Sequence, residues 1–308
     1  MKRKHAFLRS PIVAAAFLMA TSAIGPGFLT QTAHFTTQLG AAFGFVILVS
    51  VILDIGAQLN IWRILTITGK RAQEIAAMVF PGAGYILTGL IVFGGLAFNI
   101  GNLAGAGLGL NVLTGLSVEA GAGISAGIAI LIFMQRNALG GMDVFARVLG
   151  IIMILLTLTV VLISPPSAAE VVRGMFLPDK IDFSAIITLV GGTVGGYITF
   201  AGGHRLLDAG VKGKASIPEV NRSAVNALLL ASLMRLLLFL AAFSVVTKGL
   251  SVDASNPAAS VFRLAAGNPG YRIFGVLMWC ASITSVVGSA YTSISFLITL
   301  HPSLEKSG

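Results

Sequence analysis

The sequence has few charged residues: only 10% of its 308 residues are Asp, Glu, Lys or Arg. Soluble domains carry about 25%. Hydrophobic residues make up 56% of the chain, and the mean hydropathy is +0.94. These values exclude a soluble enzyme and a coiled coil, and they predict an integral membrane protein that crosses the lipid bilayer several times.

Cysteine is almost absent, since Cys280 is the single one in the chain. One cysteine excludes an intrachain disulfide and a cysteine-based metal cluster within the chain. The sequence also contains no His-Glu-x-x-His and no phosphate-binding P-loop motif. We therefore expect neither an enzyme nor a bound cofactor.

Apolar stretches suited to crossing a membrane, which takes roughly 20 residues, number eight. Their approximate ranges are 11–38, 41–62, 76–108, 118–135, 146–164, 183–203, 223–247 and 271–299. The basic residues before the first stretch and the small residues at 20–23 also fit a cleaved signal peptide. Because the apolar character resumes after residue 27, a retained but interrupted helix is the simpler interpretation.

Basic residues outnumber acidic ones by 20 to 11. Membrane proteins concentrate their basic residues in cytoplasmic loops. If the N-terminus is inside and the spans alternate, fourteen basic residues lie inside, five lie outside, and Arg235 falls within a span. We expect the N-terminus on the inner side of a bacterial cytoplasmic membrane and no nucleic acid partner. The oligomeric state is left open.

Two spans are interrupted by glycine and proline, the first at 25–27 and the sixth at 191–196. Both residues lower the cost of unwinding a helix. Unwound backbone at membrane depth is tolerated where it is buried in protein or lines a cavity, and paired interrupted spans mark the binding site of many transporters. Kinks or packing surfaces are the alternative. In the third span, glycines at 101, 105 and 109 have the spacing of close helix packing.

Two charged residues, Asp54 and Arg235, fall near the middle of the second and seventh spans. Ionisable groups inside a membrane are costly and usually functional. We expect them to form a pair that couples ion movement to transport. A purely structural ion pair is the alternative, as is an Arg235 whose side chain reaches the interface by itself.

Four motifs occur in a characteristic order. They are Gly25-Pro26-Gly27-Phe28, Thr68-Gly69-Lys70, Leu110-Asn111-Val112-Leu113-Thr114-Gly115 and Ser282-Ile283-Thr284-Ser285-Val286-Val287-Gly288. By their order and spacing, the chain resembles the NRAMP family of divalent-metal transporters. This resemblance implies an all-α, LeuT-type bundle with two inverted repeats of five helices, and metal ion transport by alternating access through broken helices one and six.

The resemblance also implies a domain organisation. The chain 1–308 is expected to be a single transmembrane transporter domain, with the first repeat at about 11–164 and a partial second repeat at about 183–300. Helices nine and ten of the family's fold have no counterpart among the eight spans, so the chain is either a fragment or a truncated product.

The sequence departs from the family at the positions where the family binds its metal and carries carboxylates in the third helix. Where the family has its metal-binding Asp and Asn, this sequence has Gly25 and Phe28, and Thr199-Phe200-Ala201 stands in place of Met-Pro-His. Asn99 and Asn102 match family carboxylates in the third helix, where they would form a polar path. A divalent cation needs oxygen, nitrogen or sulfur ligands, preferably anionic. We therefore assign no metal site.

Free N–H groups at the ends of broken helices favour an anion such as a carboxylate. An ion-coupled carrier of a small carboxylate or amino acid is thus an alternative function, and a non-transporting truncated or regulatory membrane protein is a second. The candidate substrate contacts are Gly25, Pro26, Gly27, Phe28, Gly195, Gly196, Tyr197 and Thr199.

Overall fold

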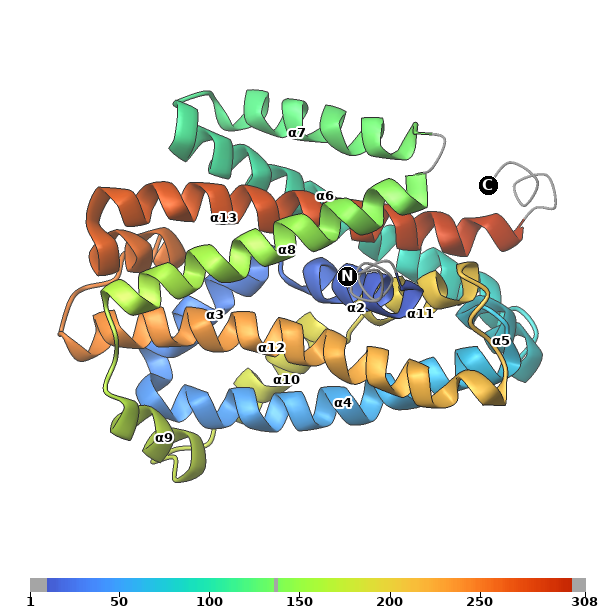
Figure 1. Cartoon of the computed structure of the whole chain (residues 1–308), viewed down its shortest axis with the longest axis horizontal. Helices are drawn as coiled ribbons and strands as arrows, with labels where there is room; N and C mark the ends of the chain where they lie inside the picture. Colours follow the sequence, from blue (N-terminus) through green and yellow to red (C-terminus); the bar gives the residue numbers. More distant parts are fainter. Residues whose placement is uncertain (1–9, 136–137, 301–308) are drawn as a thin grey trace, which may run out of the picture.

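The computed structural model describes residues 10–135 and 138–300; the regular elements in this part of the chain are all helices, joined by loops, without strands. The helices form one elongated bundle (Figure 1). Their bounds are α2 Pro11–Ala23, α3 Pro26–Leu39, η1 Gly40–Ala42, α4 Phe43–Thr68, α5 Ala72–Val79, α6 Ala83–Thr114, α7 Val118–Phe133, α8 Ala138–Ile163, α9 Ala168–Phe176, α10 Phe183–Thr193, α11 Ile198–Asp208, η2 Lys214–Ser216, α12 Ile217–Thr247, α13 Pro257–Leu297 and η3 Ile298–Leu300.

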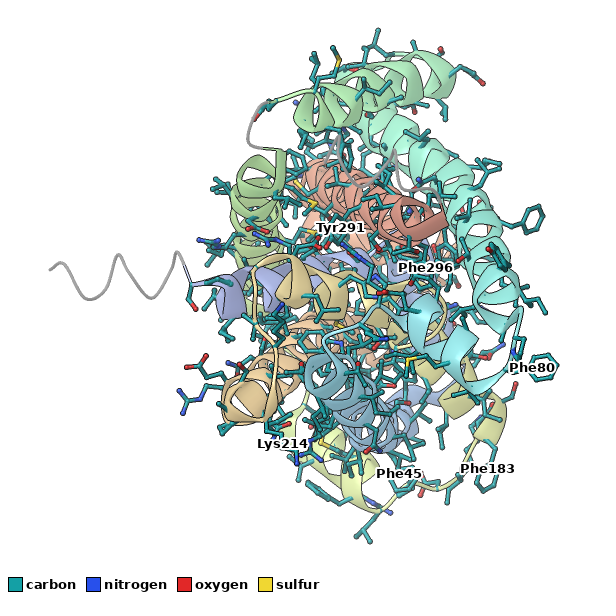
Figure 2. The ribbon with its side chains drawn as sticks, turned by 90° about the vertical axis from the view of Figure 1, so that its right-hand side faces the viewer. Phe45, Phe80, Phe183, Lys214, Tyr291 and Phe296 are labelled. Atoms are coloured by element: carbon teal, nitrogen blue, oxygen red, sulfur yellow. The ribbon has the colours of Figure 1, made fainter. Side chains whose placement is uncertain are left out.

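The predicted all-α membrane fold is confirmed. Six helical segments are long and apolar enough to cross a membrane, and the shorter apolar helices α2 and α7 lie within the first and fourth expected spans. Large apolar side chains such as Phe80 and Phe183 stand out from the bundle, whereas Tyr291 and Phe296 lie inside it (Figure 2). Outward apolar side chains suit a surface that faces lipid. The number of membrane crossings stays a prediction.

Several predicted boundaries were wrong. The expected third span at 76–108 contains two helices, α5 and α6, because Pro81 and Gly82 interrupt the apolar run and Gly82 adopts a φ of +87°. The loop expected at 248–270 is helical from Pro257 onward, with a kink at Ala266 and Gly267. Hydropathy counts apolar residues over a window and therefore misses a break of two residues.

Both predicted helix interruptions are confirmed. The first helix breaks at Ile24 and Gly25, and α3 then starts with Pro26, whose fixed φ suits a first helical position. The sixth helix breaks between α10 and α11, where Gly196 adopts a φ of +56° that other residues rarely reach. Gly191 and Gly192 remain within α10, so this break is shorter than the glycine run suggested.

The broken first helix, α2 and α3, lies between two groups of helices. The first comprises α6, α7 and α13, and the second comprises α4, α10 and α12 (Figure 1). Along the first group, a Cβ atom on Gly109 would lie 2.6 Å from the backbone nitrogen of Trp279, and one on Gly105 would lie 2.7 Å from Ser282 Oγ. The predicted close packing therefore holds for these two glycines. Gly101, by contrast, faces open space.

Candidate functional site

A cavity of about 420 Å³ opens beside the break in the first helix. It is bounded by the α2–α3 junction, by α6, by the α10–α11 helix and by α13. Gly25, Pro26, Gly27 and Phe28 all line it, as the sequence predicted, and Asn102 lines it from α6. The unwound backbone at this break therefore does line a cavity.

The cavity wall presents hydrogen-bond donors. The first turn of a helix leaves N–H groups without a carbonyl partner in that helix, and in α3 these include the N–H groups of Gly27 and Phe28. The N-cap residue, Gly25, has no side chain that could accept from them. Asn102 is 4% exposed, and its Nδ2 has no hydrogen-bond partner. None of the described residues on this wall is an Asp or a Glu.

The absence of a side chain at Gly25 has a steric reason. A Cβ atom there would lie 2.9 Å from Ser285 Oγ and 3.2 Å from Asn102 Oδ1. Ser285 Oγ in turn donates to the carbonyl of Ser22 at 2.7 Å, which fixes α13 against the end of α2. A carboxylate side chain at position 25 would have to displace these contacts. Among the residues that the structure describes, no group of three or more His, Cys, Asp or Glu is placed to hold a metal ion.

The predicted contacts from the sixth helix do not line the cavity themselves. The Tyr197 hydroxyl donates to the carbonyl of Ser22 at 3.4 Å, and its ring packs on Phe98. Thr199 is buried, and its carbonyl accepts from Trp62 Nε1 at 2.8 Å. The residues that line the cavity from this helix are Gly192 and Ile198; Gly195, Gly196, Tyr197 and Thr199 do not.

Phe28 also faces the two intramembrane charges. The guanidinium of Arg235 stacks on the Phe28 ring, 4.0 Å from its centroid. Behind the ring, Asp54 and Arg235 line a common void of about 10 Å³. Asp54 is 2% exposed and Arg235 is 4% exposed. The two expected partners are thus brought to one place, and Phe28 separates them from the larger cavity.

Of the two third-helix asparagines, only Asn102 reaches the cavity. Asn99 is partly exposed, and its Oδ1 has no hydrogen-bond partner. The two residues are three positions apart on α6 and so lie on neighbouring parts of one face. The expected polar path is not continuous along the cavity wall.

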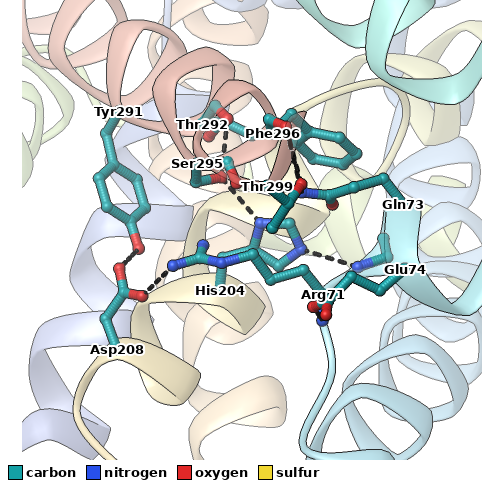
Figure 3. Close-up of polar contacts among 11 residues, drawn as sticks. Arg71, Gln73, Glu74, His204, Asp208, Tyr291, Thr292, Ser295, Phe296 and Thr299 are labelled. Carbon is teal, nitrogen blue, oxygen red and sulfur yellow. Dashed lines mark hydrogen bonds and ion pairs between the residues drawn. The ribbon is translucent and has the colours of Figure 1, made fainter. Parts of the chain in front are cut away.

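A polar cluster at the end of the bundle where α5 lies was not predicted (Figure 3). Arg71, just before α5, forms an ion pair with Asp208 at the end of α11, and Asp208 also accepts from the Tyr291 hydroxyl. His204 is fully buried; its Nε2 accepts from the Ala72 N–H at 3.2 Å. These contacts join α5, α11 and α13.

A second ion pair joins α11 to α8. Arg205 in α11 makes a bidentate pair with Asp143 in α8. The sequence carried one signal, because His204 and Asp208 are four residues apart and so lie on one face of a helix. The partners come from distant loops and helices, and charges at span ends are normally solvated, so the pairing itself could not be read from the sequence.

Comparison with known proteins gives a consistent picture. A family model described as Natural resistance-associated macrophage protein-like (Nramp) matches residues 16–297. An uncharacterized membrane protein of Bacillus subtilis, YcsG, is 62% identical over 298 residues, covering 97% of this chain and 74% of that protein. An uncharacterized membrane protein of Haemophilus influenzae is 60% identical, covering 97% and 75%.

More distant relatives have named cargo. Metal transporter Nramp3 of rice is 24% identical over 302 residues, covering 88% of this chain and 54% of the rice protein. A crystal structure of a mutant manganese transporter from Eremococcus coleocola superposes with a TM-score of 0.75 at 16% identity, covering 96% of this chain and 66% of that one. The chain therefore spans about two thirds of the solved transporter and shares its fold.

Proposed function

This chain belongs to the Nramp family, and from that premise we propose that it forms the translocation pathway of a secondary transporter. The family and the likeness to a manganese transporter support metal ion transport as the general function. In our proposal, α2, α3, α4, α10, α11 and α12 rock against α6, α7, α8 and α13. The observation that supports this mechanism is that both broken helices adjoin one cavity.

The orientation is part of the same proposal. We place the N-terminus on the cytoplasmic side of a bacterial inner membrane, because the basic residues then concentrate inside. The polar cluster of α5, α11 and α13 then closes the cytoplasmic end of the pathway.

One observation favours a second cargo class, a small carboxylate or amino acid. In the part of the chain that the structure describes, the cavity wall offers free donors from Gly27, Phe28 and Asn102 and no carboxylate. N–H groups at a helix N-terminus stabilise a negative charge, whereas a divalent cation needs oxygen, nitrogen or sulfur ligands in place of its water. On the residues alone, we propose the anionic cargo.

Calorimetric titration of the purified protein separates the two cargoes. We expect acetate, lactate or pyruvate to bind and Mn²⁺ to bind weakly or not at all. Asn102→Leu should weaken carboxylate binding by about tenfold, because a hydrogen bond to a charged group contributes roughly 1.5 kcal/mol. Asn99→Leu is the matched control, since that residue does not line the cavity.

Two results would decide against the anionic cargo. Tight Mn²⁺ binding without carboxylate binding would return the assignment to a metal ion. Equal weakening by Asn102→Leu and Asn99→Leu would mean that the cavity beside the first break is not where the carboxylate binds.

A further inference from the structure

The charge pair behind Phe28 differs from an ordinary structural ion pair. Arg235 Nε and Nη2 have no hydrogen-bond partner, and neither has Asp54 Oδ1. No ion pair within 4.0 Å joins the two side chains. By contrast, Arg205 and Asp143 are joined directly by two hydrogen bonds. Asp54 and Arg235 therefore line one void without a direct ion pair between their side chains.

The space between the two charges suits a single water molecule. A void of about 10 Å³ is close to the least volume that a water occupies, and a buried water needs two to four polar partners. The unpartnered atoms of Asp54 and Arg235 supply such partners. Among the described residues, Asp54 and Arg235 are the only titratable side chains on the void. Its other polar side chains, Ser50, Thr193 and Ser232, come from three helices.

We propose that Asp54 takes up a proton when a small carboxylate binds in the neighbouring cavity. The proposal rests on the anionic cargo proposed above and adds its coupling ion. A proton from water converts the Asp54 carboxylate to the neutral acid, and no other bond changes. Arg235 then carries an uncompensated positive charge directly behind the Phe28 ring, which lines the carboxylate's cavity.

The linkage works in both directions. When Asp54 is ionised, its negative charge offsets the positive charge of Arg235, so the pair contributes little to the binding free energy of an anion in the cavity. With Asp54 protonated, Arg235 attracts the anion through low-dielectric surroundings, where Coulomb interactions are strong. By reciprocity, a bound anion favours protonation by the same free energy. The same arrangement disfavours a cation in the cavity.

Proton uptake can be measured directly on the full-length protein in detergent. Potassium pyruvate is added to weakly buffered protein between pH 6 and 8, and a pH indicator follows the protons. We expect uptake that approaches about one proton per pyruvate bound, and an apparent Kd that rises by up to about tenfold per pH unit. This part of the test requires no variant.

Variants locate the proton. Asp54→Asn should still bind pyruvate, without proton uptake and with a flat pH profile. Asp253→Asn, an exposed carboxyl in the loop before α13, is the matched control and should behave as the wild type. Because Asp54→Asn leaves Arg235 buried without its counter-charge, the double variant Asp54→Asn/Arg235→Gln serves where the single variant fails to fold, and it too should show no uptake.

The outcomes separate this inference from the function on which it rests. Pyruvate binding without proton uptake, or uptake that persists in both Asp54 variants, overturns the coupling and leaves the carboxylate carrier intact. Absence of binding by pyruvate, acetate and lactate at every pH overturns both.

Discussion

The contact of Gly105 with the broken first helix makes a prediction about stability. A Cβ atom at this position would lie 2.9 Å from Pro26 Cβ and 2.7 Å from Ser282 Oγ, and it would also meet Pro26 Cγ. The proline ring cannot rotate away, since its φ is fixed. Gly105→Ala must therefore push α6 away from the start of α3.

The size of the effect follows from two opposing terms. Adding a methyl group to a tightly packed contact costs about 1–3 kcal/mol. Replacing a helical glycine by alanine returns about 1 kcal/mol. We expect a net loss of up to about 2 kcal/mol for Gly105→Ala. Gly101→Ala, one turn earlier, meets nothing within 4 Å and should be neutral or slightly stabilising.

Thermal unfolding in detergent, followed by intrinsic fluorescence, measures the difference. A gap of about 1–3 kcal/mol corresponds to several degrees in Tm, since each kcal/mol shifts a domain of this size by roughly 2–4 °C. Gly105→Ala should also weaken the proposed carboxylate binding, because α3, whose first N–H groups line the cavity, begins at Pro26. If Gly105→Ala and Gly101→Ala unfold at the same temperature, α6 does not pack on the break as described.

Two further predictions concern topology and the buried charges. In a Cys280→Ser background, a cysteine introduced at Ser117 should react with an impermeant maleimide added outside and one at Ser216 should not; the reverse pattern would invert the orientation. In a double-mutant cycle on stability in detergent, Asp54→Asn and Arg235→Gln should each destabilise the protein while the double variant loses much less, because a buried charge without its counter-charge is costly. Additive effects, with coupling below about 0.5 kcal/mol, would show that the two charges do not interact.

Much of the fold could be predicted because its determinants are local. Glycine and proline at 25–27 act on the backbone that they occupy, and so the break in the first helix was visible in the sequence. Hydropathy located the apolar spans in the same way, and it failed where a short interruption such as Pro81-Gly82 divides one apolar run into two helices.

The site was predicted only in part because its arrangement depends on contacts between distant segments. The four residues of the first break line the cavity. Gly195 and Tyr197 were expected beside them, yet the direction in which α11 leaves its break turns Tyr197 toward Ser22 and Phe98. The stacking of Arg235 on Phe28 joins residues more than two hundred positions apart, and no local pattern encodes it.

The ionic contacts of α11 have a consequence for the proposed rocking motion. Two ion pairs hold this half of the sixth helix: Arg71–Asp208 joins it to the segment before α5, and Arg205–Asp143 joins it to α8. Buried His204 also bonds to the start of α5. In the proposed rocking motion, moving α11 away from α5 and α8 requires all of these contacts to break, so they stabilise the closed arrangement at that end. Arg71 and Asp208 keep some solvent exposure, so dissolved salt screens this pair more strongly than the deeper one. On the proposed mechanism, higher ionic strength should therefore favour opening at this end, independently of any effect on cargo binding.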